Sequence, residues 1–414
     1  MNAEIIAIGS ELLTPFRQDT NSLYLTRRLN ELGVEVIRKS IVGDHRGHLA
    51  EAVTQALDRA DIVITMGGLG PTEDDLTREC VAEALGVQLK RDNDIVAELY
   101  ARFAARRVKM TENNARQADV LAGAIVLPND RGSAPGQWWQ DRWGSRQKIV
   151  ILLPGPPFEL EAMFEKQCFE RLQHAVPAQH IATRELRIAL VGESTADHRA
   201  APIYTRYTDV ETTILAGAGE VQFHLRARSE SPEEAEERVE ELASELEEEF
   251  AEEAFASHGE KLEQIVGYYL QMRNATIAVA ESCTGGLLAQ RLTSVSGSSR
   301  YFVGGVVAYS NDMKTAFADV PPLMIAENGA VSKQVASALA EGIRKRCRAT
   351  FGVGITGVAG PTGGTDEKPV GLVYVGVTDG KRTEVVERKF PGDRDRIRMW
   401  ASQQALDMVR RRLV

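Results

Sequence analysis

EIIAIGS (residues 4–10) is the first of three apolar segments typical of β-strands, and VEVIRKSIV (residues 34–42) and DIVITMGG (residues 61–68) are the others. The two segments between them, TNSLYLTRRLNELG (residues 20–33) and HLAEAVTQALDRA (residues 48–60), repeat apolar residues at helical spacing. This βαβαβ order predicts an α/β domain with a parallel, doubly wound sheet. Ligands of such sheets bind beyond the carboxyl ends of the strands, so the loops there are candidate sites.

Two further regions follow. Residues 180–255 contain a strand-like segment, RELRIALVG (residues 184–192), a short helix near residues 195–206, two strands within residues 212–229 and a charged helix, which together predict a small α+β domain. Residues 254–264 are expected to link it to a second α/β sheet domain. Because 414 residues exceed what one core usually organises, we expect three domains, at residues 1–172, 173–256 and 257–414.

The acidity of the chain is concentrated in one segment. Residues 230–253 contain thirteen glutamates and one arginine, a net charge of −12, whereas the whole chain carries −10. Apolar residues recur at helical spacing within it, at Ala235, Val239, Leu242, Leu246 and Phe250. This pattern predicts an amphipathic helix with a solvated acidic face, or alternatively a partner-binding one. Its charge would repel phosphate, so no nucleic-acid partner is expected.

Composition also bears on location. No apolar run is long enough for a membrane span, and Glu4 lies within what would have to be the core of a signal peptide. The four cysteines form no CxxC pair, which speaks against a disulfide framework and a thiolate zinc site. We therefore expect a cytoplasmic protein with reduced thiols and no membrane partner.

Polar loops follow the strands of the first domain. They are GSELL (residues 9–13), GDHRGH (residues 43–48), GGLGPTEDDLT (residues 67–77) and LPGPP (residues 153–157). The third loop combines glycines, which let a phosphate approach the backbone, with adjacent carboxylates, which suit a divalent cation. Its candidate residues are Gly67, Gly68, Gly70, Thr72, Asp74 and Asp75, and Glu11, Asp19 and Asn21 could add oxygen ligands. Asp74 and Asp75 could instead only cap a helix, and His45 and His48 are not expected to bind metal.

AVAESCTGGLLAQ (residues 278–290) places two candidate nucleophiles, Ser282 and Cys283, between a strand and a helix whose first amides favour an anion. No histidine follows His258, so this domain contains neither a Ser-His-Asp nor a Cys-His arrangement. A desolvated lysine can replace histidine as the base. Lys314, which closes the segment VVAYSNDMK (residues 306–314), is the best candidate. The alternative is that Ser282 is only an N-cap.

Three further elements lie plausibly at the same sheet edge. Tyr309 could tune the lysine or relay its proton. The loop GITGVAGPTGGTDEKPVG (residues 354–371) is rich enough in glycine to approach a nucleotide closely, although it could be only a long turn. FPGDRDRIR (residues 390–398) places Arg394, Arg396 and Arg398 at the start of the last helix.

These motifs, together with GSS-x-YF-x-GG-VV and NGAVS, resemble across residues 260–414 the nicotinamide mononucleotide (NMN) deamidase domain of the CinA (competence/damage-inducible protein A) family. The resemblance implies a cofactor-free Ser/Lys amidohydrolase that converts NMN into nicotinic acid mononucleotide and ammonia in pyridine-nucleotide (NAD) salvage. Ser282 would be the nucleophile, Lys314 its base and Tyr309 an assistant. The implied substrate-binding residues are Thr284, Gly285, Gly286, Asn311, Gly360, Gly363 and Arg394.

Residues 1–170 resemble the MoCF-like domain of the same family through GSELL, Asp19-Thr20-Asn21, GGLGPTEDD and LPGPP. The resemblance implies hydrolysis of ADP-ribose to AMP and ribose 5-phosphate with Mg²⁺, Mn²⁺ or Co²⁺, and with K⁺ as a further candidate. Molybdenum-cofactor proteins usually have an LPGNP-like loop, so LPGPP argues against cofactor synthesis. The alternatives are a molybdopterin-binding protein and a non-catalytic adaptor in competence.

The middle domain resembles the small KH-like module of this family. KH modules that bind RNA use a GXXG loop with basic surroundings. The one candidate, Gly217-Ala218-Gly219-Glu220, lacks that pattern. We therefore interpret the domain as a spacer or dimerisation element, and the resemblance implies a homodimer.

Overall fold

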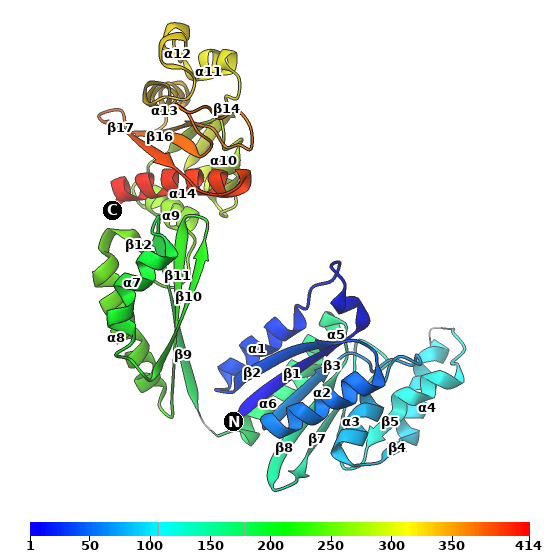
Figure 1. Ribbon diagram of the computed structural model, residues 1–414. Coiled ribbons are helices and arrows are strands. Elements are labelled where there is room, and N and C mark those ends of the chain that lie inside the picture. The colour runs from blue at the N-terminus through cyan, green and yellow to red at the C-terminus, as the bar shows by residue number, and fades with distance from the viewer. Residues whose placement is uncertain (106, 178) are drawn as a thin grey trace. The chain divides into compact units, whose positions relative to one another are not determined.

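The computed structural model describes residues 1–105, 107–177 and 179–414. It divides into two compact units, Met1–Ile181 with Arg228–Ala235 and Ala182–Ala227 with Glu236–Val414. Three larger β-sheets, each packed against helices, make up these units (Figure 1). The first sheet belongs to the first unit, and the C-terminal sheet belongs to the second.

The N-terminal domain is built on a six-stranded sheet in the order β2-β1-β3-β8-β7-β6. Its strands are β1 (Asn2–Ile8), β2 (Glu35–Val42), β3 (Ile62–Met66), β6 (Ile125–Leu127), β7 (Gly136–Trp143) and β8 (Arg146–Leu153). Its larger helices are α1 (Asn21–Glu31), α2 (Arg46–Arg59), α3 (Thr77–Leu85), α4 (Asn93–Ala105), α5 (Pro157–Met163) and α6 (Phe169–Ala175). The βαβαβ order predicted for residues 4–68 is present.

Both faces of this sheet are covered, and β1 supplies apolar side chains to both cores, although its buried Glu4 is bonded to Arg59. Ala3, Ile5 and Ala7 pack in one core with α1, α5 and α6, whereas Ile6 and Ile8 pack in another with α2 and α3. Successive side chains of a strand point to opposite faces, so a continuous apolar run supplies two cores at once. Figure 1 shows this layered arrangement.

The sheet is mixed, not wholly parallel as predicted. β2, β1, β3 and β8 run parallel, but β7 pairs antiparallel to β8, and β6 pairs antiparallel to β7. The β7–β8 hairpin turns between Trp143 and Arg146, a connection so short that it forces antiparallel pairing. The sequence patterns also missed α4 and a small antiparallel ladder formed by β4 (Leu89–Arg91) and β5 (Asp119–Leu121).

The middle region is the predicted α+β domain, with a four-stranded sheet in the order β10-β11-β9-β12. Its elements are β9 (His180–Ala189), α7 (Glu193–Tyr204), β10 (Val210–Gly217), β11 (Glu220–Ser229), α8 (Pro232–Phe250) and β12 (Ala254–Ala256). The acidic segment forms α8 and buries its apolar stripe as predicted. The segment predicted as a linker instead contributes β12, which pairs with β9.

The C-terminal domain has a five-stranded sheet in the order β14-β13-β15-β16-β17. The first three of these strands are parallel, β16 pairs antiparallel to β15, and β17 pairs antiparallel to β16. The strands are β13 (Ile277–Glu281), β14 (Phe302–Val307), β15 (Phe351–Gly357), β16 (Leu372–Thr378) and β17 (Thr383–Lys389). The helices are α9 (Leu262–Met272), α10 (Leu287–Thr293), α11 (Asn311–Ala318), α12 (Pro322–Asn328), α13 (Lys333–Cys347) and α14 (Arg394–Leu413). α13 covers one face, and α9, α10 and α14 cover the other.

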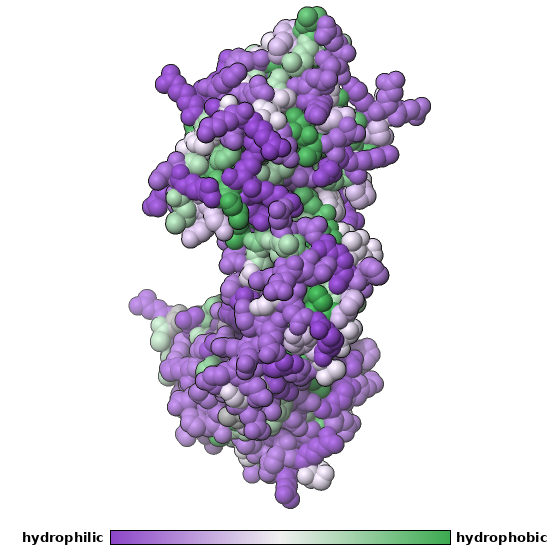
Figure 2. Space-filling model, turned by 90° about the vertical axis from the view of Figure 1, so that its left-hand side faces the viewer, coloured by the Kyte–Doolittle hydropathy of each residue, from purple (hydrophilic) through white to green (hydrophobic). Residues whose placement is uncertain are grey.

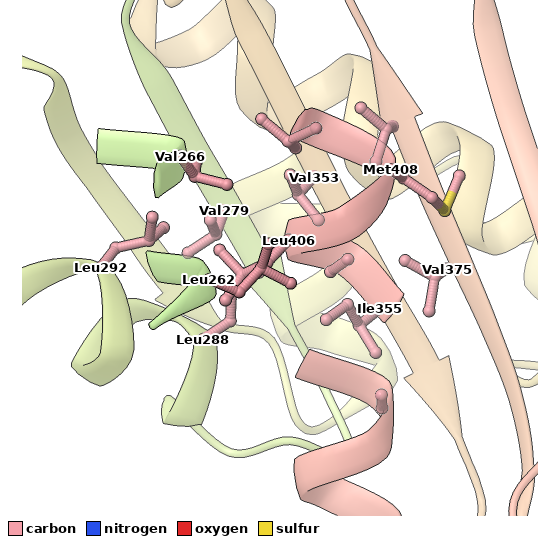
Figure 3. Close-up of a cluster of buried hydrophobic side chains, with 14 of the residues drawn as sticks. Leu262, Val266, Val279, Leu288, Leu292, Val353, Ile355, Val375, Leu406 and Met408 are labelled. Carbon is pink, nitrogen blue, oxygen red and sulfur yellow. The ribbon is translucent and has the colours of Figure 1, made fainter. Parts of the chain in front are cut away.

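The larger C-terminal core lies between α9, α10, α14 and the sheet. Figure 3 shows Leu262 and Val266 of α9 and Leu406 of α14 meeting Val279, Val353 and Ile355 of the sheet, all of them buried. This packing fixes the carboxyl end of β13, which carries the candidate nucleophile, within a rigid frame.

The surface is mostly hydrophilic on the face drawn in Figure 2, where hydrophobic residues form small separate areas. In the described part of the chain, no helix combines the length and apolar character needed to cross a membrane.

Candidate active sites

Ser282 lies directly after β13, at the carboxyl end of an inner strand of the C-terminal sheet. Its amide donates to Ile355 O of β15 at 2.9 Å, which extends the strand pairing up to the serine. The side chain is largely buried, with 8% of its surface exposed. α10 begins only at Leu287, and its N-cap is Gly286 without a side-chain contact. Ser282 is therefore not an N-cap, and its hydroxyl is free for another role.

Lys314 points at this serine from the first turn of α11. Its Nζ lies 3.3 Å from Ser282 Oγ and donates to the carbonyls of Ala308 and Tyr309, each at 3.0 Å. A neutral amine has two N–H groups and one lone pair. The three oxygens around Nζ match the three N–H groups of an ammonium, and the Ser282 hydroxyl can equally donate to the lone pair of a neutral amine, so the contacts accommodate both forms of Lys314.

Burial favours the uncharged form of this lysine. Its side chain is buried, and no carboxylate forms an ion pair with it among the described residues. Desolvation therefore lowers the pKa of Lys314 below the ordinary lysine value, with a smaller opposing effect of the nearby Cys283. A lysine in this state can accept the proton of a serine.

Cys283, the other candidate nucleophile, is in the wrong environment for attack. It is buried among apolar residues of the large C-terminal core, and burial raises the pKa of its thiol to about 12. The thiolate is the nucleophilic form of cysteine, so this side chain is inert near neutral pH. The structure thus favours Ser282 over Cys283.

Tyr309 contacts the lysine through its backbone, not its ring. Its carbonyl accepts from Lys314, whereas its exposed hydroxyl accepts from Arg394 Nη2 at 3.1 Å. Arg394 also donates to Gly360 O at 2.7 Å, and so connects the predicted glycine-rich loop with the Tyr309 segment. The proton relay through the phenol, one of the predicted roles, is not formed in this structure.

The helix amides predicted to face an anion are already used. Gly286, Leu288 and Ala289 donate their amides to the buried carboxylate of Glu281, and Gly285 donates its amide to Ser282 O. The amides of Gly285 and Gly286 therefore already have protein acceptors, and the part of these residues in substrate binding stays a prediction. Sequence patterns missed Glu281 because a glutamate that ends an apolar strand carries no signature of such a role.

The other predicted C-terminal residues are dispersed around the serine. Thr284 is fully buried, its Oγ1 has no partner among the described residues, and its carbonyl accepts from Arg398 at 2.9 and 3.1 Å. Asn311 is exposed at the start of α11, and Gly363 is exposed in the loop. Within the described structure, Lys314 bonds Ser282 Oγ and the Tyr309 carbonyl, whereas Arg394 bonds the Tyr309 hydroxyl and Gly360 O.

The N-terminal domain contains a cavity of about 650 Å³ at the carboxyl ends of β1 and β3, a volume suited to a small-molecule ligand. All predicted candidates of this domain except Thr72 line it, including all five expected metal ligands. The lining residues that carry charge are Glu11, Arg17, Asp19, Asp44, Asp74, Asp75 and Glu159. Thr72 is exposed and contacts the cavity only through Asp75, whose carboxylate accepts from its amide at 2.8 Å and from its hydroxyl.

The glycine loop of this cavity is shaped by packing. A Cβ at Gly67 would lie 2.3 Å from Ile8 O, and one at Gly68 would lie 2.2 Å from Thr77 Oγ1. Both glycines have positive φ, which other residues rarely adopt. The buried guanidinium of Arg78 donates to the carbonyls of Leu69 and Gly70 at 2.8 and 2.9 Å and holds the loop from behind. Arg78 was missed, since nothing in its sequence context marks it as buried.

The expected metal ligands differ in how they are used. Asp19 accepts from the amide of Ser22 at 2.9 Å, and Asp75 is occupied by Thr72. Asn21 donates to Gly155 O at 2.8 Å, and its Oδ1 is buried with no partner among the described residues. α3 begins at Thr77 without a side-chain cap, so Asp74 and Asp75 are not its N-caps.

The donor chemistry fits a hard divalent cation, because the cavity offers carboxylate and amide oxygens. Across residues 1–105, 107–177 and 179–414, however, no three His, Cys, Asp or Glu side chains converge as a metal centre. Mg²⁺ is commonly held by one or two carboxylates, water and the phosphates of its substrate. The cavity fits that mode of binding and not a preformed protein cage.

One deeply buried residue of this cavity was also missed. Gln117 is 2% exposed, donates to Ser133 Oγ at 3.1 Å, and leaves its Oε1 without a partner in the described structure. It comes from a short 3₁₀-helix (Glu112–Ala118) far along the chain from the predicted loops, and no local pattern indicates that it reaches the cavity.

The candidate KH loop has a structural role. Gly217 and Gly219 form the turn between β10 and β11, and Gly219 O accepts from the amide of Leu190 at 2.9 Å. A Cβ at Gly219 would lie 2.9 Å from the side chain of Gln403, so this turn is packed against α14 within the second unit. It is not a free loop.

Comparison with known proteins matches each part of the chain to a family model. Residues 4–174 match the probable molybdopterin binding domain, residues 183–256 the damage-inducible protein CinA KH domain, and residues 259–413 the CinA C-terminal domain. A structure of the competence/damage inducible protein CihA from Agrobacterium tumefaciens aligns with 36% of this chain and 90% of its own, with 38% identity and a TM-score of 0.35.

Full-length relatives match as well. A CinA-like protein from Koribacter versatilis is 64% identical over 414 residues, and one from Acidobacterium capsulatum is 60% identical over 414 residues. In both alignments 100% of this chain and 100% of the relative are covered. The chain therefore belongs to the CinA family, with a MoCF-type N-terminal domain, a KH-like middle domain and a CinA C-terminal domain.

Proposed function

We propose that the C-terminal domain is a Ser/Lys amidohydrolase that converts NMN into nicotinic acid mononucleotide and ammonia. The observation that carries this proposal is the buried amine of Lys314, 3.3 Å from Ser282 Oγ and donating to two backbone carbonyls. Because no histidine follows His258, this pair is the proposed means of activating a hydroxyl at the site.

The chemistry follows from the pair. Ser282 Oγ attacks the carboxamide carbon while its proton moves to the neutral amine of Lys314. The resulting ammonium returns that proton to the leaving nitrogen, which departs as ammonia and leaves an acylated serine. Water, deprotonated by the same amine, then releases the nicotinate product and restores Ser282.

The choice of NMN rests on family membership and on the charge near the serine. Arg394 is exposed and donates to the neutral oxygens of Gly360 and Tyr309. A guanidinium bonded in this way retains its full charge for a phosphate. Arg398 approaches the same loop through Thr284 O, although Asp395 forms an ion pair with it at 3.3 Å.

Replacing the nucleophile tests this assignment. We expect Ser282→Ala to release no ammonia from NMN, because alanine leaves Lys314 nothing to deprotonate. Cys283→Ala is the matched control and should keep at least about half of the wild-type rate, since a buried thiol of high pKa takes no part. Lys314→Ala should be folded and inactive. Ammonia release and NMR of the product measure the activity of all three variants. Full activity of Ser282→Ala would show that Ser282 is not the nucleophile.

We further propose that the N-terminal cavity hydrolyses ADP-ribose to AMP and ribose 5-phosphate with a divalent metal. The supporting observation is the carboxylate-rich lining, in which Arg17 is the one cationic side chain. Such a lining repels a pyrophosphate unless cations intervene. Asp74, Asp75, Glu11, Asp19 and Asn21 are the side chains that would hold the metal, and the bound metal would neutralise phosphate charge and activate water.

Metal removal tests this second activity. With EDTA we expect ADP-ribose cleavage to stop, and with added Mg²⁺, Mn²⁺ or Co²⁺ to return, because the lining alone cannot bind the pyrophosphate. NMR of the incubated protein follows AMP formation. Turnover that persists in EDTA would contradict the proposal, and pterin binding without any ADP-ribose turnover would favour a molybdopterin-binding role instead.

A further inference from the structure

We infer that Glu281 is a positioning residue of the amidase site, which holds the loop of Ser282 so that the hydroxyl stays within reach of Lys314. The inference rests on the proposed amidase activity. It concerns a residue that neither attacks nor takes a proton, and whose side chain points into the start of α10.

The carboxylate of Glu281 is bonded to three backbone amides. It accepts from Gly286 N and Leu288 N through Oε2, each at 3.1 Å, and from Ala289 N through Oε1 at 2.8 Å. The side chain is 1% exposed. Because Glu281 precedes Ser282 directly and its partners follow it by five to eight residues, the carboxylate closes the serine loop into a ring.

The charge of this carboxylate is balanced by the amides. No lysine or arginine forms an ion pair with Glu281 in the described part of the chain. Hydrogen bonds from three amides at a helix start stabilise a buried anion. A glutamine has nearly the same shape, but its NH₂ group would face amide donors and its oxygen carries no full charge. The native arrangement therefore depends on the carboxylate.

Two other contacts hold the same loop from different sides. Ser282 N donates to Ile355 O, and Arg398 donates to Thr284 O. With the Glu281 ring, these contacts leave the loop little freedom. The separation between Ser282 Oγ and Lys314 Nζ is at the long end for a hydrogen bond, so a small displacement would break it.

A positioning role differs from plain helix capping in its kinetic effect. Loss of a cap lowers stability, but at temperatures where the protein stays folded it leaves kcat unchanged. Loss of positioning lowers kcat, because the serine and its base are misaligned in the folded protein. KM should change little, since Glu281 has no surface exposed to substrate. The pH at which kcat is half-maximal should also stay the same, since Lys314 is untouched.

The test compares two buried carboxylates of one domain. Glu281→Gln is expected to lower kcat for ammonia release from NMN by about 10- to 100-fold, with KM within about two-fold. The control is Glu263→Gln, whose carboxylate is also buried and is bonded to Arg291 of α10 at 2.7 Å, away from the serine loop. It should keep kcat. Thermal unfolding of both variants sets the temperature of the assay, and an unchanged kcat in Glu281→Gln would overturn the inference.

A second readout does not depend on NMN. A fluorophosphonate is attacked by an activated serine, with a P–O bond formed, fluoride displaced and the serine proton taken by Lys314. Intact mass spectrometry should show labelling of the wild type at Ser282, with slower labelling of Glu281→Gln by a similar factor. Labelling of the wild type without NMN turnover would show that NMN is not the substrate. The positioning role of Glu281 would then be tested by the labelling rates alone. Equal labelling rates, or an unlabelled wild type, would overturn the inference.

If Glu281→Gln does not fold, Glu281→Asp serves in its place. Aspartate keeps the charge but is one methylene shorter, so it cannot reach all three amides. We expect a kcat below that of the wild type but above that of a protein in which the Ser282 loop is not held. A wild-type kcat in this variant would contradict the role of the ring.

Discussion

At the residue scale, the protein separates two adjacent nucleophiles by environment. Ser282 and Cys283 are neighbours in sequence, yet the hydroxyl faces a buried lysine while the thiol lies in the apolar core. Burial affects each group in the direction set by its charged form, raising the pKa of the thiol and lowering that of the amine. The same desolvation therefore keeps the thiol protonated and favours the neutral, proton-accepting form of the amine.

The pKa of Lys314 predicts a pH dependence. The base must be neutral, so kcat for NMN should rise with pH as the ammonium loses its proton. Because burial lowers the pKa of Lys314, the half-maximal pH should lie below the ordinary lysine value of about 10.4. Between the folded and the unfolded pKa the unfolded chain binds more protons, so this group also makes stability rise with pH there.

A pH–rate profile of NMN hydrolysis measures this rise of kcat with pH, the ascending limb of the profile. Lys314→Ala, which removes the amine, should show no such limb in its residual rate. A limb that appeared only above the ordinary lysine pKa would show that Lys314 is charged in the resting site and is not the base.

At the element scale, strands place the sites and loops complete them. The βαβαβ pattern predicted which strands end beside the N-terminal loops, and the loops after β1 and β3 do line one cavity. Apolar periodicity missed β6, β7 and α4, because a strand that pairs through a hairpin needs only a turn and a half-buried surface. The tryptophans of β7 serve both cores, a role that depends on pairing with β8 and not on local pattern.

The glycine loop gives a prediction at this scale. Gly68→Ala should destabilise the N-terminal domain by about 1–2 kcal/mol through its positive φ, and by about 1–3 kcal/mol more through the clash with Thr77. Gly86→Ala is the control, since Gly86 has a similar φ but nothing within 4 Å of the added Cβ. Urea unfolding and ADP-ribose turnover measure both variants. Equal losses of unfolding free energy in the two variants would contradict the prediction, because the loop would then move away from Thr77 without a free-energy cost.

At the scale of the whole molecule, the two candidate sites belong to different compact units. Each has its own sheet, and each depends on different chemistry, an oxygen-lined cavity in one and a Ser/Lys pair in the other. Most of the middle domain belongs to the same compact unit as the C-terminal domain, where the β10–β11 turn packs against α14.

This separation predicts two independent activities in one chain. In a mixture of NMN and ADP-ribose, Ser282→Ala should stop ammonia release and leave AMP formation at the wild-type rate. EDTA should have the opposite effect on the wild type, because the amidase residues need no metal. Both products can be followed by NMR in the same sample. A several-fold change in AMP formation in Ser282→Ala would show that the two sites are coupled.

The sequence by itself determined the α/β class, the three regions and the loops that form the N-terminal cavity, and it favoured a lysine over a histidine as the proposed base. These follow from periodicity, from glycine and carboxylate spacing, and from the absence of histidine after His258. Only the tertiary structure decided the rest, because contacts between distant segments depend on packing. Packing brings Lys314 to Ser282, buries Cys283, assigns the helix amides to Glu281 and leads Gln117 into the cavity.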